Sequence, residues 1–141
     1  MTIIFGVLIL PEQPTHKVAE PKRLQAKKEI IKILRTVPYE QGFHFHTAPE
    51  QFTRETATSM EQFEKKLQTV PVESVVFHFL RKDFQNWIKG TLGDNEIAER
   101  INGLDKALPD EKLRKEIIAI VQTRIAELKR ELPHSLRHNH S

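Results

Sequence analysis

The sequence predicts a mainly α-helical protein, a compact bundle of short helices plus a long C-terminal helix, with one or two short N-terminal strands. Three observations support this fold class. Apolar residues recur at helical spacing in several segments, proline or a capping residue precedes most of these segments, and only 5 of the 141 residues are glycine. Because a chain of this length can bury a sizeable core, we expect a single domain over residues 1–141.

Residues 1–20 are expected to form an apolar strand or arm followed by a proline-rich connector. Met1–Leu10 is uncharged and largely apolar, but it is far shorter than the roughly 20 residues that a membrane-spanning helix needs. It also lacks the basic residues and the cleavage site of a signal peptide. The segment is therefore predicted to be either a buried strand or an arm that contacts a partner.

A basic helix is predicted from Pro21 to Val37, because proline suits the first turn of a helix and another proline follows the segment. Its core-facing residues are expected to be Leu24, Ile30, Ile31, Leu34 and Val37. The remaining surface carries six basic residues: Lys22, Arg23, Lys27, Lys28, Lys32 and Arg35.

The segment Gly42–Thr47 (GFHFHT) alternates strictly between phenylalanine and histidine, which predicts a short, half-buried strand. Its two phenylalanines would lie on one side and its two histidines on the other. If Met1–Leu10 is also a strand, the two segments can pair. Ala48–Thr58 contains a proline and several threonines and is predicted to be a loop.

Residues 43–102 are expected to form one helical module, in which four short helices follow the strand. Ser59 begins an S-x-x-Q capping box, which predicts the start of the first helix. Pro71 suits the start of the second helix. Asp83 and Asp94 are predicted to cap the third and the fourth.

The longest helix is predicted over residues 109–132, with two acidic residues at its positive N-terminal end. Ile118 and Ile120 widen its apolar stripe, so this helix is expected to contact two partners. The stripe itself consists of Leu113, Ile117, Val121, Ile125, Leu128 and Leu132.

The sequence contains none of the usual catalytic or cofactor-binding signatures. It has no cysteine, which excludes disulfides, thiolate metal sites and a cysteine nucleophile, and which fits a reducing, cytoplasmic location. Neither a glycine-rich phosphate loop nor a G-x-S-x-G nucleophile elbow is present. Because the carboxylates are all accounted for as helix caps or solvated surface, we predict no catalytic residue and no cofactor.

Three histidines are the candidates for a metal site. His44 and His46 share one side of the predicted strand, and His78 lies in a helix further along the chain. Three neutral imidazoles plus water would make an open catalytic zinc site. However, no H-E-x-x-H-like pair fixes two ligands, and no sequence rule brings His78 to the strand. The alternative to a metal site is an exposed strand face plus one helix histidine.

The basic helix Lys22–Arg35 is the candidate nucleic-acid element. Its six cations can neutralise several phosphates and give salt-sensitive binding. Base recognition would also need suitable polar side chains at a protruding helix end, or exposed aromatic rings for stacking, and this helix offers only Gln25 and its arginines. The alternative is a solvated helix face.

Residues Phe43–Ile101 contain the pattern F-x-F, then F/Y-H, D-F-x-x-W-I and L-G-D-x-x-L-A-x-x-I, with one conservative change at Ile97. This segment resembles an uncharacterised domain family of archaea and bacteria. Family members often carry Asn where this chain has Lys82. The matching residues are Phe43, Phe45, Met60, Phe63, Leu67, Phe77, His78, Asp83, Phe84, Trp87, Ile88, Leu92, Gly93, Asp94, Ile97, Ala98 and Ile101.

The resemblance implies a domain but no reaction. It is consistent with Phe84 and Trp87 as core anchors and with Asp83 and Asp94 as helix caps. Alternatively, His78 and Asp83 form a polar pair at the junction of two helices, since five residues across a turn permit a hydrogen bond.

The sequence as a whole favours a non-enzymatic interaction or regulatory module that forms a homodimer or binds another protein, without contacting a membrane. The wide apolar stripe of the last helix and the apolar Met1–Leu10 both indicate burial beyond one compact core. The two alternatives are a nucleic-acid-associated protein that uses Lys22–Arg35 and a metal-dependent enzyme that uses the three histidines.

Overall fold

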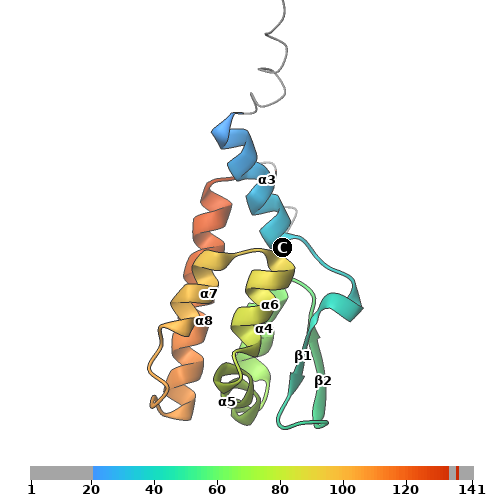
Figure 1. Ribbon diagram of the computed structural model, residues 1–141, viewed down its shortest axis with the longest axis vertical. Coiled ribbons are helices and arrows are strands. Elements are labelled where there is room, and N and C mark those ends of the chain that lie inside the picture. The colour runs from blue at the N-terminus through green and yellow to red at the C-terminus, as the bar shows by residue number, and fades with distance from the viewer. Residues whose placement is uncertain (1–20, 134–135, 137–141) are drawn as a thin grey trace, which may run out of the picture.

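The computed structural model describes residues 21–133 and residue 136, so the predicted strand or arm at Met1–Leu10 lies outside the described residues. The predicted fold class is confirmed: helices dominate, the longest is C-terminal, and a small sheet lies near the N-terminus (Figure 1). The elements are α3 (Lys22–Leu34), the 3-10 turn η1 (Tyr39–Gln41), β1 (Phe43–His46), β2 (Phe52–Ala57), α4 (Met60–Thr69), α5 (Val72–Leu80), α6 (Asp83–Trp87), the π-helical turn η2 (Ile88–Leu92), α7 (Asn95–Asn102) and α8 (Asp110–Arg130).

Helix α8 runs along one side of the bundle, and α4, α5 and α7 pack against it (Figure 1). The β1–β2 hairpin lies on the other side, where it contacts α4 and α5. One core joins these layers, and Phe45, Phe63 and Phe84 are its largest fully buried side chains. The predicted core anchors are confirmed, because Phe84 is 0% and Trp87 8% exposed.

The two strands form an antiparallel hairpin in which Phe43 pairs with Ala57. The predicted loop over Ala48–Thr58 is therefore wrong in its second half, which is strand β2. The sequence pattern is weak there for a physical reason: Ala57 is the one buried residue of β2, and the register shifts midway. Arg54, with φ of 72°, lies in the left-handed region beside this shift, as in a β-bulge.

Helix α3 ends at Leu34, earlier than predicted, and only part of its expected core face is buried. Ile30 and Leu34 are buried as predicted, but Ile33 is buried in place of Ile31, which is 41% exposed. Leu24 is also exposed, at 37%. Ile31 is exposed because it lies beside the buried face formed by Ile30, Ile33 and Leu34. Leu24 is exposed because it lies in the first turn of α3, at the end that extends beyond the other helices (Figure 1).

Two of the predicted helix caps are confirmed and one is wrong. Ser59 accepts a hydrogen bond from the backbone N–H of Gln62, and Asp94 accepts from the first-turn N–H groups of α7. Asp83 does not cap α6. The residue before that helix is Lys82, which has no side-chain capping bond, and the Asp83 carboxylate instead binds a histidine of α5.

The third predicted helix consists of α6 continued by the π-helical turn η2. The turn closes with hydrogen bonds from Gly93 and Asp94 to the carbonyl oxygen of Ile88, and Gly93 supplies the expected left-handed end at φ of 90°. The stripe of α8 is buried as predicted except at Ile125, which is half-buried. Within the described residues, none of the helices combines the length and apolar character needed to cross a membrane.

Candidate functional site

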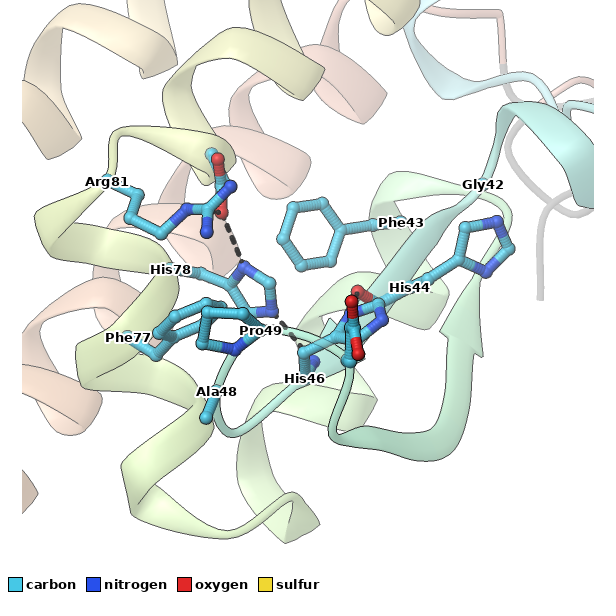
Figure 2. A pocket seen from close by; sticks show the side chains of 11 residues that line it. Gly42, Phe43, His44, His46, Ala48, Pro49, Phe77, His78 and Arg81 are labelled. Atoms are coloured by element: carbon cyan, nitrogen blue, oxygen red, sulfur yellow. Dashed lines mark hydrogen bonds and ion pairs between the residues drawn. The ribbon is translucent and has the colours of Figure 1, made fainter.

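A cavity of about 430 Å³ lies between the hairpin and the C-terminal end of α5, and all three candidate histidines line it (Figure 2). Strand β1 and the turn after it form one wall, and α5 with the start of α6 forms the other. The lining residues are Gly42, Phe43, His44, His46, Ala48, Pro49, Glu50, Phe77, His78, Arg81 and Asp83.

His78 joins the two walls, because both of its ring nitrogens are hydrogen-bonded. Its Nε2 accepts from the backbone N–H of His46 at 2.8 Å, and its Nδ1 lies 2.8 Å from Oδ2 of Asp83 (Figure 2). Since Nε2 must carry a lone pair to accept, the proton of the neutral ring lies on Nδ1 and is donated to Asp83. The alternative suggested by the resemblance, a polar pair between His78 and Asp83, is therefore what the structure contains.

The surroundings of His78 favour its neutral form. The residue is 4% exposed, and the rings of Phe43, Phe77 and Phe84 lie 4.7, 5.0 and 5.6 Å from it, centroid to centroid. Burial lowers the pKa of His78 below its usual value of 6.5, although the hydrogen bond and the charge of Asp83 oppose the shift. His78 is thus held as one neutral tautomer with no free lone pair.

Arg81 completes the α5 side of the cavity. Its Nε lies 3.1 Å from Oδ2 of Asp83, and its guanidinium carbon lies 4.8 Å from the centre of the Phe77 ring. Half of this side chain is exposed, so the ion pair contributes little to stability and chiefly orients Asp83. One carboxylate oxygen is therefore hydrogen-bonded to His78 and ion-paired with Arg81.

His44 and His46 lie on the outer side of β1, as the alternation predicts, but they do not join His78 around one point. Nδ1 of His44 lies 2.8 Å from Oγ1 of Thr56 on β2, and its ring points away from His78 (Figure 2). Nδ1 of His46 lies 2.9 Å from the carbonyl oxygen of His44. Residues 21–133 and 136 contain no group of three or more His, Asp or Glu placed to hold a metal ion.

The outer face of the hairpin carries a continuous row of four rings, which we call the aromatic row: Tyr39, His44, Phe52 and His46. Successive centroids are 4.9, 6.0 and 5.3 Å apart along this order. Tyr39 is 58% and Phe52 41% exposed. Sequence reasoning missed the row because Phe52 was placed in a loop, and the available signal was the short turn between two β-prone segments.

The basic candidates on α3 divide into two groups. Arg35 follows the last helical residue and donates to the carbonyl oxygens of Lys32 and Thr91 at 2.7 and 2.9 Å, and so fastens α3 to η2. The side chain of Lys32 lies over Gly93. The other four (Lys22, Arg23, Lys27 and Lys28) lie in the N-terminal half of α3, where Arg23 and Lys27 border a hollow with Glu131, Leu132 and Pro133.

Comparison with known proteins gives a family but no activity. No curated protein and no solved structure is significantly similar to the chain. A family model matches residues 21–122 and, in a second overlapping match, residues 80–140. Together these matches span the basic helix, the hairpin and the whole helical bundle. The chain therefore belongs to DUF5752, a family of unknown function.

Proposed function

We propose that the protein is a non-enzymatic interaction module that self-associates through the outer face of its hairpin. The aromatic row carries this proposal. Tyrosine and phenylalanine are enriched at the cores of protein interfaces, and tyrosine is also enriched among their hot spots. Two exposed rings joined by two half-exposed histidines make a continuous apolar surface, and no described residue covers it.

The hydrogen bonding of His78 supports a non-enzymatic role. A general base needs a free lone pair within reach of its substrate. The lone pair of His78 already accepts from a backbone N–H of β1, and the partner of its other nitrogen, Asp83, is shared with Arg81. In this arrangement the histidine–aspartate pair joins the hairpin to α5.

A second copy of the chain is the partner that the charges favour. Glu50 and Arg54 lie on either side of Phe52 in the sequence, both are exposed, and neither forms an ion pair within residues 21–133. In a two-fold symmetric contact each Arg54 can face Glu50 of the other copy, so the surface is complementary to itself. The bulge at Arg54 opposes pairing through the strand edge, which leaves the face as the contact.

The test is sedimentation velocity over a range of concentrations, with Phe52→Ser as the variant. We expect a weak dimer of the wild type, with Kd of about 10–100 µM, because four rings cover less area than a stable interface needs. Phe52→Ser should raise Kd at least about tenfold, since the ring at the centre of the row is lost.

Ile31→Ser is the matched control, because Ile31 has the same exposed fraction as Phe52, 41%, but belongs to α3 and not to the hairpin. It should leave the dimer unchanged. A wild type that stays monomeric up to about 1 mM, or equal weakening by both substitutions, would contradict self-association through this face.

A further inference from the structure

The N-terminal part of α3 is exposed and strongly basic. We call residues 22–29 the α3 projection. Every one of them is exposed except the half-buried Lys27, and none belongs to the core. Four are basic and one, Glu29, is acidic. Lys22, Arg23 and Lys27 form no ion pair with another residue of the described chain.

The charges of the projection work against the helix that carries them. The N-terminal end of a helix is positive and favours acidic side chains, but the first turn of α3 has none and begins with Lys22 and Arg23. The pairs Arg23–Lys27 and Lys28–Lys32 place like charges four residues apart, where they repel. These like charges therefore oppose helix formation, and at Lys22, Arg23 and Lys27 no ion pair with a described residue offsets the repulsion.

An anionic partner accounts for both the charge and the exposure. We propose that the α3 projection binds the phosphate backbone of nucleic acid, without reading its sequence. Its cations would replace condensed counterions on the phosphates, so binding should weaken steeply with salt. Sequence readout is not expected, because the projection carries no aromatic ring and only Gln25 among the amides that recognise bases.

Helix α3 exposes too little apolar surface to lie in a membrane, which favours nucleic acid over an anionic membrane as the partner. A helix that lies in a membrane surface inserts a broad apolar face. The apolar face of α3, formed by Ile30, Ile33 and Leu34, is buried against the bundle. The exposed large apolar side chains of α3 are Leu24 and Ile31, which lie two turns apart and are separated by lysines.

The experiment measures fluorescence anisotropy of a labelled, random-sequence 20-base-pair DNA with the full chain at several salt concentrations. If three cations contact phosphate, the slope of log K against log salt should be about −2.7, and affinity should fall about 40-fold between 50 and 200 mM salt. The triple variant Lys22→Gln, Arg23→Gln and Lys27→Gln should reduce affinity at least about tenfold at low salt and flatten the slope.

A second triple variant controls for net charge. Lys106→Gln, Lys112→Gln and Lys115→Gln also remove three positive charges, but from exposed positions just before α8 and in its first two turns. This variant should bind DNA nearly as well as the wild type. Circular dichroism checks that both variants fold; glutamine is a good helix former, so neither should lose helix content. Equal losses in the two variants, salt-independent binding, or no binding at low salt would overturn the proposal. So would binding to vesicles of anionic lipid in the absence of DNA binding.

Discussion

At the scale of single residues, His78 contributes most to the geometry of the candidate site. Its two hydrogen bonds connect three elements: the backbone of β1, its own helix α5, and Asp83 at the start of α6. A buried ring that both accepts and donates can replace neither bond with water. We therefore expect His78 to act as a structural connection between the hairpin and the bundle.

This role predicts a specific pH dependence of stability. Burial lowers the pKa of His78 in the folded protein below its value in the unfolded chain. As the pH falls through about 6.5, the unfolded chain therefore binds a proton that the folded protein does not, and the free energy of unfolding decreases. A proton on Nε2 would also place two donors against each other, because that atom accepts from the N–H of His46.

The measurement is urea unfolding at pH 7.5 and pH 5.5, for the wild type and for His78→Gln. We expect the variant to be less stable at pH 7.5 by about 1–3 kcal/mol, because a buried hydrogen-bonded group is replaced imperfectly. The wild type should lose more stability than the variant on acidification. All other histidines are present in both proteins, so parallel losses would show that His78 is not the group responsible.

The site also shows what residue types alone can predict. Placing His44 and His46 on one side of a strand needed only the alternation of side chains. The pair formed by His78 and Asp83 followed as an alternative from their spacing. The third member of the contact, the backbone N–H of His46, could not be predicted, because every residue carries such a donor and only the tertiary fold selects one.

At the scale of elements, the junction between α5 and α6 contains an unfavourable backbone conformation. Lys82, which joins the two helices, has φ of 65°, in the left-handed region that disfavours most side chains. Asparagine tolerates this region better than lysine, and Asn is the residue that the family resemblance implies at this position. The departure noted in the sequence thus corresponds to local strain.

Lys82→Asn is accordingly expected to stabilise the protein by about 0.5–1 kcal/mol, measured by urea or thermal unfolding. Lys82→Ala provides the control. It removes the same exposed hydrogen bond to Asn102 but keeps a side chain that disfavours positive φ, so it should give no gain. Equal stability of the two variants would indicate that the backbone conformation at this position costs little.

The elements that the sequence predicted poorly are those held by tertiary contacts instead of their own pattern. The helices α4, α7 and α8 carry caps or clear apolar stripes and were located closely. Strand β2 has one buried residue and a bulge at Arg54, so its period of two is broken, and it is held by pairing with β1 and packing on α4. The inward face of α3 was misjudged because adjacent apolar residues, such as Ile30 and Ile31, leave the exact direction of the stripe open, and because periodicity does not show how far the bundle extends along it.

At the scale of the whole molecule, the elements differ in how many buried contacts attach them to the bundle. Asp94, 2% exposed, caps α7 and also binds Arg124 of α8 at 2.8 Å, so two helices share one buried carboxylate. The hairpin is fastened by His78 and by Trp87, whose indole N–H donates to the carbonyl oxygen of Gln41. By contrast, the buried residues of α3 and the hydrogen bonds of Arg35 all lie near its C-terminal end.

This uneven attachment predicts a gradient of local stability, which amide hydrogen exchange measures directly. A 13-residue helix is marginal in water without tertiary packing, and residues 22–29 contribute no side chain to the buried core. Their amides should therefore exchange near the rate of an unstructured chain, while those of the buried stripe of α8, from Leu113 to Leu128, should exchange only on global unfolding. Protection of residues 22–29 equal to that of α8 in the free protein would mean that another part of the chain covers the projection, and that its surface is not available to a partner.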